Sequence, residues 1–273
     1  MEPLGDPPQR EEALAGGNVS TVSKVGDTVR RGTGPWTPAV HALLRHLERV
    51  GFDGAPRVLG TGERGREVLS YVPSVTPDRA SPEAVTEQAL AEVGRLLRRY
   101  HEAARGFVLP EGVSWHHQGL PGPNAVACHN DVSPRNTVFR GGWPVAFLDW
   151  DLASPALPAW DLAHVAWQFV PLSGDAGCIR DGWASPPDRA RRLRVLCDGY
   201  GLPERDRAGF AGLVARRMEA TASGIEDLAA GGSPAHERLV REGVPTLLRE
   251  DKAWVGRNAG RLDVALLEGA PGG

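Results

Sequence analysis

The sequence predicts an α+β protein in which a small, mainly β N-terminal part precedes a larger, mainly helical C-terminal part. Short alternating segments separated by turn residues dominate the first 73 residues. Long segments with apolar residues at three- and four-residue spacing follow residue 158, and one hairpin pattern lies between the two regions. We therefore expect an N-terminal lobe over residues 1–73 and a C-terminal lobe over 74–273.

The N-terminal lobe is expected to be a small sheet with one helix. Gly26-Asp27 lies between two alternating segments, which is the pattern of a β-hairpin. Residues 38–50 carry Val40, Leu43 and Leu47 on one helical face, and this spacing predicts a helix with one buried side. The expected strands span residues 19–24, 28–31, 57–61 and 67–72.

The C-terminal lobe is expected to begin with a helix capped by Ser81-Pro82, since serine caps helices and proline suits their first position. A short strand over 125–128 and a polar loop over 129–136 follow. Gly141-Gly142 then separates the two arms of a hairpin, 137–140 and 145–148. The remaining chain predicts helices at about 159–170, 187–200, 205–228 and 236–260.

Composition excludes several classes of protein. The 31 basic and 34 acidic residues give a net charge of -3, so a general nucleic-acid binder is not expected. No run of about 18 apolar residues predicts a membrane span, and the N-terminus lacks a signal pattern. Three widely spaced cysteines form neither a disulfide framework nor a zinc motif. A cytoplasmic protein is the expectation.

The segment His129 to Asn136 carries the strongest chemical signal. Asp131 and Asn136 are five residues apart, the spacing of a kinase catalytic loop. A carboxylate is needed there to orient or accept the proton of an attacking hydroxyl, and an amide oxygen to hold a metal ion that bridges phosphates. Ser133-Pro134 supplies a turn that lets both side chains reach one point.

Asp149 follows an apolar strand and lies 13 residues after Asn136, at the far end of the predicted hairpin. Because the hairpin folds back, Asp149 is expected beside Asn136 as a second ligand of Mg²⁺, which prefers hard oxygen donors. Asp151 is either a further metal contact or a surface acid, and the second interpretation is favoured. Asp161 is interpreted as structural, at a helix start where it braces the catalytic loop.

Two weaker signals concern phosphate binding. Gly16, Gly17 and Asn18 form a turn where bare backbone could meet a phosphate. Val29 and Arg31 share a strand face, so Arg31 could reach phosphates while Val29 packs on the base. The alternative is that Arg30 and Arg31 are solvated residues of an edge strand.

Other polar and aromatic residues have plainer interpretations. The pair His116 and His117 is not expected to bind metal, because adjacent side chains point apart. His129 is expected to be a packed residue that orders the loop, and Cys128 to be buried. The acids Glu219, Glu226 and Asp227 either bind ammonium groups of a cationic substrate or lie on a solvated helix face, the favoured interpretation. Most of four tryptophans are expected in the core, with one possible stacking partner for the acceptor: Trp143, Trp150, Trp160 and Trp167.

With these motifs, the chain resembles the aminoglycoside phosphotransferase family of the protein-kinase-like superfamily. The resemblance covers most of the first 170 residues and is most specific from Cys128 to Ala163. The matching stretches are 14–18, 26–31, 128–138, 148–151 and 160–163.

The resemblance implies a protein-kinase-like fold, ATP or GTP, Mg²⁺, and phosphorylation of a hydroxyl on a small molecule. It makes Asp131 the catalytic base and Asn136 and Asp149 the metal ligands. It also places the nucleotide base at a hinge formed by Ser70, Tyr71 and Val72.

Three positions differ from the usual family pattern. Arg31 stands where the family usually has lysine, and Asn130 stands where it has glycine. The helix glutamate that normally pairs with that lysine is not evident, since Val40 or His41 falls near its place. These changes concern the part of the site that positions phosphates.

Three hypotheses follow. The favoured one is a Mg-dependent kinase for an aminoglycoside-like molecule or another alcohol. The second is a catalytically weak or inactive kinase-like module that binds nucleotide, motivated by the altered phosphate-positioning residues. The third is a metal-dependent hydrolase built on His129, Asp131, Asp149 and Asp151. The acceptor, the choice between ATP and GTP, and the oligomeric state are not predicted.

Overall fold

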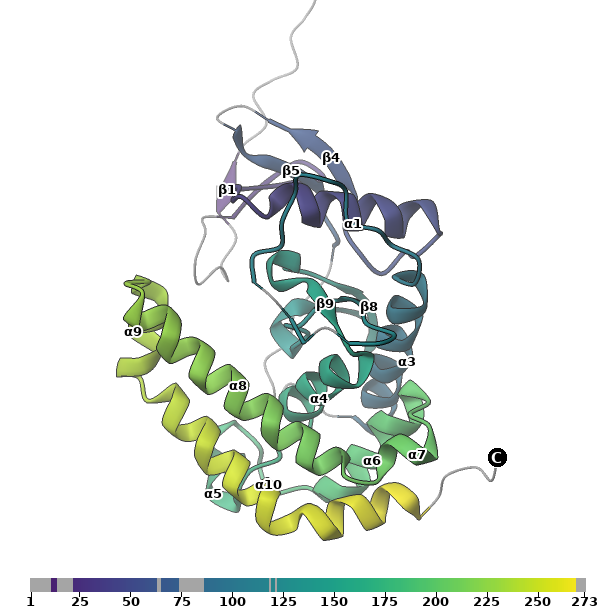
Figure 1. Cartoon of the computed structure of the whole chain (residues 1–273), viewed down its shortest axis with the longest axis vertical. Helices are drawn as coiled ribbons and strands as arrows, with labels where there is room; N and C mark the ends of the chain where they lie inside the picture. Colours follow the sequence, from purple (N-terminus) through teal and green to yellow (C-terminus); the bar gives the residue numbers. More distant parts are fainter. Residues whose placement is uncertain are drawn as a thin grey trace, which may run out of the picture.

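The strands β1, β4 and β5 lie at one end of the molecule and the long helices α8 and α10 at the other (Figure 1), and the mixture of strands and helices confirms the predicted α+β class. The expected lobe boundary at residue 73 adjoins a segment that is not described, and it stays a prediction. The computed structural model describes residues 11–13, 22–62, 65–73, 86–117, 119–120 and 122–268.

The N-terminal sheet has five strands in the order β1-β2-β3-β5-β4, with antiparallel neighbours. Gly26 takes a φ of 59° in the β2–β3 turn, a conformation that glycine adopts without strain. The third and fifth strands pair so that Arg31 lies opposite Glu67. The strands are β1 Glu12–Ala13, β2 Ser23–Val25, β3 Thr28–Arg31, β4 Val58–Thr61 and β5 Glu67–Ser70.

One helix, α1 (Thr37–Arg49), covers this sheet and has proline near its start. It buries Val40, Leu43 and Leu47, as the spacing predicted. His41 is also buried on this helix. The N-terminal sheet borders the candidate site.

A long helix, α3 (Glu87–Ala103), begins the described part of the C-terminal region. Thr86 caps it by accepting a hydrogen bond from the backbone N–H of Ala89 at 3.0 Å. The predicted start at Ser81-Pro82 lies outside the described residues. The helix packs closely on α6 (Arg189–Tyr200), and glycine at position 94 permits this contact.

One hairpin and one further two-stranded antiparallel sheet support the candidate site. The predicted one is present as β7 (Thr137–Arg140) and β8 (Trp143–Phe147). The second pairs β6 (Val126–Cys128) with β9 (Ser154–Ala156), and β9 was not predicted because its three residues include a proline.

The helical region contains more breaks than the sequence pattern predicts. Gly209 and Gly243, with φ of 79° and 75°, interrupt the two long helices expected near the C-terminus. A short helix, α5, was also missed. The remaining helices are α4 Pro158–Phe169, α5 Asp175–Arg180, α7 Glu204–Arg207, α8 Phe210–Ala230, α9 Pro234–Arg241 and α10 Val244–Leu267.

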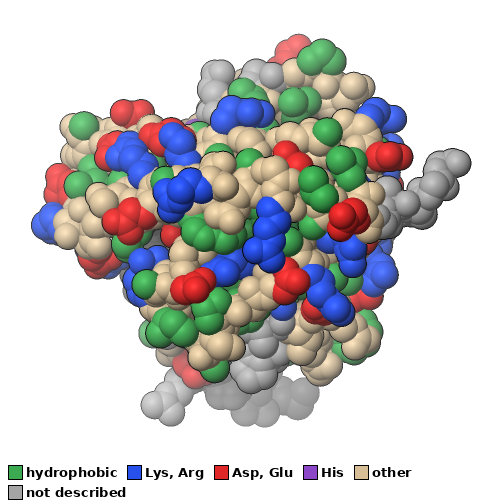
Figure 2. Space-filling view, turned by 90° about the horizontal axis from the view of Figure 1, so that it is seen from below, with side chains coloured by type: hydrophobic (Ala, Val, Ile, Leu, Met, Phe, Trp, Pro, Cys, Tyr) green, Lys and Arg blue, Asp and Glu red, His purple; other side chains and the backbone are tan. Residues whose placement is uncertain are grey.

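One continuous apolar core extends from α1 and β5 through α3 and α4 to α8 and α10. On the face seen in Figure 2, basic and acidic side chains are interspersed, as the near-zero net charge suggests. Within the described ranges, every helix is too short or too polar to cross a bilayer.

Candidate active site

The loop after β6 is held in place by Asp161, which lies in the first turn of α4. Its carboxylate accepts hydrogen bonds from the backbone N–H groups of His129 and Asn130, each at 2.9 Å. Asn130 adopts a φ of 64°, which asparagine tolerates better than most residues, so it can replace the glycine usual at this position. The predicted structural role of Asp161 is therefore confirmed.

Asp161 also receives a hydrogen bond from His101 at 3.0 Å, and His101 in turn contacts the hydroxyl of Tyr200 at 2.8 Å. Burial would raise the pKa of Asp161, but the hydrogen bond and charge of His101 outweigh it and lower the pKa to about 2. His101, Cys128 and Asp161 form the one group with metal-ligand spacing among the described residues. Because the hydrogen bonds already use Asp161 and His101, we interpret the group as structural.

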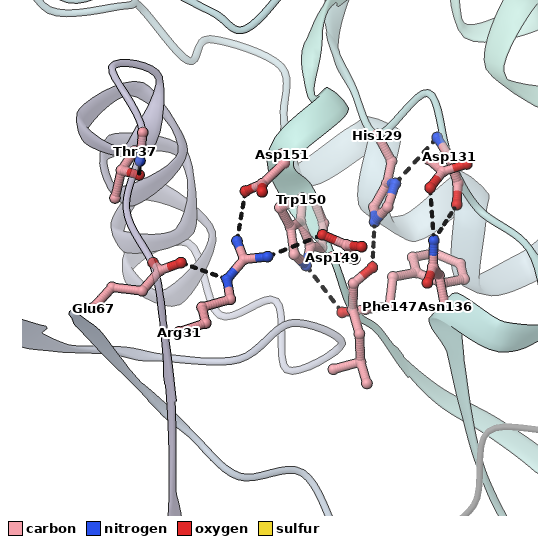
Figure 3. Close-up of polar contacts among 12 residues, drawn as sticks. Arg31, Thr37, Glu67, His129, Asp131, Asn136, Phe147, Asp149, Trp150 and Asp151 are labelled. Carbon is pink, nitrogen blue, oxygen red and sulfur yellow. Dashed lines mark hydrogen bonds and ion pairs between the residues drawn. The ribbon is translucent and has the colours of Figure 1, made fainter. Parts of the chain in front are cut away.

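His129 is fully buried and orders the loop from within, as predicted. Its Nδ1 accepts from the backbone N–H of Asp131 at 3.3 Å, so Nε2 carries the proton that it donates to the carbonyl of Leu148, at 3.0 Å. Figure 3 shows this ring between the loop and the end of β8. It ties the proposed base to the strand that carries Asp149.

Asp131 and Asn136 lie together at the centre of the loop (Figure 3). The side-chain amide of Asn136 donates to a carboxylate oxygen of Asp131 at 2.8 Å and to its backbone carbonyl at 2.9 Å. About a third of the Asp131 side chain (33%) is exposed, so a hydroxyl can approach it. Burial raises the pKa of Asp131 to about 6, while His129, Arg217 and Asn136 oppose the shift. Its carboxylate form still dominates at neutral pH.

The hairpin returns Asp149 to the side of Asn136. The backbone N–H of Leu148 donates to the carbonyl of Asn136 at 2.8 Å, so Asn136 directly before β7 and Asp149 shortly after β8 lie at the same end of the hairpin. Asp149 has a φ of 61° and an exposed side chain that contacts Arg31 through one oxygen. With its amide nitrogen bound to Asp131, Asn136 has its side-chain oxygen left for a cation. These hard oxygen donors fit Mg²⁺.

Arg31 is buried on β3, an inner strand, so the interpretation as a solvated edge residue is wrong. Its Nε donates to Glu67 of β5 at 2.5 Å, and His41 of α1 contacts the second oxygen of Glu67 at 2.7 Å. A strand glutamate thus pairs with the cation, and the helix contributes a histidine instead of an acid. Sequence reasoning missed this pair, although Glu67 alternates with apolar Leu69 on the buried face of its strand.

The guanidinium of Arg31 also reaches both acids after β8 (Figure 3), at 2.9 Å from Asp149 and 2.6 Å from Asp151. Burial would lower the pKa of Arg31, but Asp151, Glu67 and Asp149 raise it above its usual value. Asp151 is partly buried and ion-paired, so its interpretation as a surface acid is wrong. Burial raises the pKa of Asp151 despite Arg31.

The residues predicted to contact the nucleotide are only partly described. Gly16, Gly17 and Asn18 lie outside the described residues. Val29 and Ser70 lie on the neighbouring strands β3 and β5, and the backbone N–H of Tyr71 donates to Asp27 at 2.9 Å. Val72 follows in the same extended segment, just before the undescribed residues 74–85. Their contacts with a nucleotide stay a prediction.

Other sequence candidates have structural partners. His116 stacks on Trp36 with ring centroids 3.8 Å apart, and its ring is 6.5 Å from that of His117, so the pair faces different neighbours. Cys128 is buried, whereas Trp143 is exposed. Glu219 and Glu226 pair with cations of α10, not with their neighbours on α8. The four residues of the hydrolase hypothesis form no group with metal-ligand spacing within the described part.

A hollow of about 550 Å³ lies between α6 and α10. It is open to solvent, and none of the candidate catalytic residues lines it. Two of its three arginines have partners: Arg191 pairs with Glu87 at 2.7 Å, and Arg194 donates to the carbonyl of Glu268 at 3.0 Å. The candidate active site is therefore the loop at residues 129–136 and not this hollow.

Residues 108–210 match the model of the phosphotransferase enzyme family. A trifolitoxin immunity protein from Rhizobium leguminosarum bv. trifolii is 40% identical over 205 residues, which cover 73% of this chain and 77% of that protein. The chain belongs to the phosphotransferase enzyme family, which confirms the family resemblance predicted from the motifs.

Solved structures confirm the protein-kinase-like fold. A choline/ethanolamine kinase family protein from Mesorhizobium loti has a TM-score of 0.65 at 18% identity, covering 95% of this chain and 93% of that one. The amicoumacin kinase hAmiN, in complex with AMP-PNP, Ca²⁺ and its ligand, has a TM-score of 0.62 at 12% identity, covering 95% and 89%. Aminoglycoside 2'-phosphotransferase-IIIa with GDP has a TM-score of 0.58 at 14% identity, covering 91% and 94%.

Proposed function

We propose that this protein transfers the γ-phosphate of ATP or GTP to a hydroxyl group of a small molecule, with Mg²⁺. The observation that supports the proposal is the linkage of two side chains and one backbone position. Asp131 is hydrogen-bonded to Asn136, and a backbone hydrogen bond joins Asn136 to Leu148, the residue before Asp149. Membership of the phosphotransferase enzyme family supports the same reaction.

Asp131 orients the acceptor hydroxyl and takes its proton. The hydroxyl oxygen forms a bond to the γ-phosphorus, the bond from that phosphorus to the β,γ-bridging oxygen breaks, and the nucleoside diphosphate leaves. The hydrogen bond from Asn136 fixes one oxygen of Asp131, and the other oxygen lies 3.6 Å from Nε2 of His164. Fixed geometry of this kind supplies much of the rate enhancement when little covalent chemistry involves the protein.

Asn136 and Asp149 would hold Mg²⁺ through oxygen atoms. When bound, the cation neutralises charge on the phosphates. Arg31 lies next to Asp149 and adds a positive charge on the side of the sheet. The glycine turn at 16–18 and the hinge at Ser70, Tyr71 and Val72 complete the nucleotide site in this proposal.

The acceptor is proposed to be a toxin or antibiotic. This rests on the relative named for immunity to trifolitoxin, which is 40% identical to this chain. Phosphorylation would protect a cell because it adds charge and bulk to a group that the toxin needs for recognition.

The alternative function is an inactive module that binds nucleotide. One observation favours it: Arg31 forms ion pairs with Asp149, a proposed metal ligand, and with Asp151. A kinase must release Asp149 from this contact when Mg-nucleotide binds, whereas a module without transfer has no such requirement.

Thermal unfolding with nucleotides tests the proposal. We expect ATP or GTP to raise the midpoint in the presence of Mg²⁺ and to lose most of this effect with EDTA, because the cation couples the phosphates to Asp149. At a nucleotide concentration of 100 times Kd, binding adds about 2.7 kcal/mol of stability. Asp149→Asn should lose the Mg-dependent part, while Asp53→Asn, at an exposed acid, should keep it.

A panel of hydroxylated toxins, amino sugars and simple alcohols then separates the two functions. Acceptor-dependent release of nucleoside diphosphate, with a phosphorylated product in the mass spectrum, supports the kinase. Mg-dependent binding without consumption of nucleotide for any acceptor supports the inactive module. Equal protection with and without Mg²⁺ would contradict both proposed metal ligands.

A further inference from the structure

Arg217 reaches from α8 to the catalytic loop. One terminal nitrogen donates to the backbone carbonyl of Asn130 at 2.8 Å, directly before the proposed base. The other contacts the hydroxyl of Thr221, and the guanidinium lies 5.5 Å from the centre of the Trp160 ring. Its Nε is shielded from solvent and has no hydrogen-bond partner. The side chain is therefore held in place with one nitrogen, Nε, unused.

This guanidinium has no paired carboxylate among the residues that the structure describes. Asp161 and Asp131 act on it only at longer range. Asp161 already accepts three hydrogen bonds, from His101 and two backbone groups. Burial lowers the pKa of Arg217, but arginine stays charged at neutral pH. Arg217 is partly exposed, so a ligand can reach its guanidinium, and an anionic ligand would supply the missing counter-ion.

His117 lies within electrostatic range of both Arg217 and Asp131. Burial and the positive charges of His116 and Arg217 lower its pKa, and Asp131 opposes the shift. His117 is therefore mostly neutral at neutral pH. Its Nδ1 is shielded and has no hydrogen-bond partner. Two nitrogen-bearing side chains with unused hydrogen-bonding atoms thus lie within electrostatic range of the proposed base.

Two of the three acids that a cationic acceptor could use, Glu219 and Glu226, are already ion-paired. Glu219 contacts Arg249 at 3.0 Å and Lys252 at 2.7 Å, and Glu226 contacts Arg249 at 2.7 Å. These contacts join α8 to α10, so both carboxylates belong to the packing of the two helices. A polycation would have to displace Arg249 and Lys252 before it could use them.

We propose that Arg217 binds a carboxylate on the acceptor, and that this contact presents a hydroxyl of the same molecule to Asp131, with His117 as a second polar contact. The inference rests on the proposed phosphotransfer, because it concerns the second substrate of that reaction. It assigns the acceptor to the hydroxy acids and excludes amino sugars that carry several ammonium groups.

Matched acids and amides test the inference without knowledge of the natural acceptor. Three pairs serve as probes: lactate and lactamide, gluconate and gluconamide, N-acetylserine and its amide. Binding is followed by thermal unfolding with Mg-AMP-PNP present, so that anions cannot report on the nucleotide site. We expect at least one acid to bind about fivefold or more tightly than its amide, because a charged hydrogen bond is stronger than a neutral one. Kanamycin should give no protection.

Substitutions at position 217 test whether Arg217 causes the preference for acid over amide. Arg217→Met should abolish the preference for acid over amide, and Arg217→Lys should retain part of it. Arg216→Met removes a charge from the exposed neighbouring position and should leave the preference intact. Protection by Mg-AMP-PNP in all three variants shows that they fold and that the nucleotide proposal holds independently.

Three results would overturn the inference. One is the absence of any acid preference in the wild type while Mg-AMP-PNP still protects. The second is an equal preference in Arg217→Met. The third is an acid effect that disappears when AMP-PNP is added, since the anion would then bind where phosphates do.

Discussion

Arg31 shows how a single residue joins the two sides of the candidate site. The guanidinium joins Glu67 on the sheet to Asp149 and Asp151 on the other side of the site. The planar fork of arginine can hold three carboxylates at once, which a lysine ammonium on a single stem cannot do in the same geometry. Arginine at this position is therefore matched to the acids around it.

Arg31→Lys is expected to impair the protein although lysine is usual in related sequences. The loss of two directed hydrogen bonds should cost about 1–3 kcal/mol of unfolding free energy and weaken protection by Mg-nucleotide. Denaturant unfolding with and without nucleotide measures both effects. Unchanged stability together with tighter nucleotide binding would show that the fork is not needed.

Glu67→Gln removes the charge that faces Arg31 in the sheet. The Glu67 side chain is only 1% exposed, so its replacement leaves part of the Arg31 charge buried without a counter-ion. We therefore expect the free energy of unfolding to fall by about 3 kcal/mol. Glu48→Gln is the matched control, because Glu48 and Arg57 form an exposed pair at 3.5 Å worth less than about 1 kcal/mol. Similar losses in the two variants, measured by urea unfolding, would contradict the role of the buried pair.

At the scale of elements, the first turn of α4 acts as a support for the catalytic loop. Asp161 has a pKa of about 2 in the folded protein against 3.8 without the fold. Its contribution of about 2 kcal/mol is thus present above pH 3.8 and is lost as the pH falls toward 2. Asp161→Asn should be destabilised at pH 6, and the difference from wild type should shrink at pH 3. If the difference in unfolding free energy between wild type and Asp161→Asn stayed constant from pH 6 to pH 3, the charge of Asp161 would not contribute to stability.

The contact between α3 and α6 depends on glycine. A Cβ at position 94 would lie 2.6 Å from the carbonyl oxygen of Leu196, so Gly94→Ala should separate the helices and cost about 1–3 kcal/mol. Gly256→Ala is the control in α10, where a Cβ meets nothing within 4 Å and should stabilise the helix by up to about 1 kcal/mol. Equal shifts of the thermal midpoint in both variants would contradict the packing argument.

Periodic elements could be predicted from the sequence, whereas their interruptions could not. Helix α1 and the β7–β8 hairpin follow directly from apolar spacing and glycine turns. The breaks at Gly209 and Gly243 were missed because an isolated glycine is also compatible with a continuous helix. Strand β9 was missed because its pairing with β6 depends on tertiary contacts and not on its own residues.

In the whole molecule, the sheet and the helical region meet at the residues that carry the proposed chemistry. The loop spacing located Asp131, Asn136 and Asp149, since local spacing and a hairpin determine their positions. The contacts of Arg31 with Glu67 and of Arg217 with the loop could not be predicted in this way. They join segments 36 and 87 residues apart, and only the assembled fold brings these together.

The most direct test of the central claim is phosphoryl transfer by Asp131→Asn, measured with the best acceptor from the panel. The variant is nearly isosteric and should retain Mg-nucleotide protection, yet transfer should fall by about 100-fold or more, since an amide cannot take the hydroxyl proton. Transfer near the wild-type rate, with the fold intact, would contradict the assignment of Asp131 as the base.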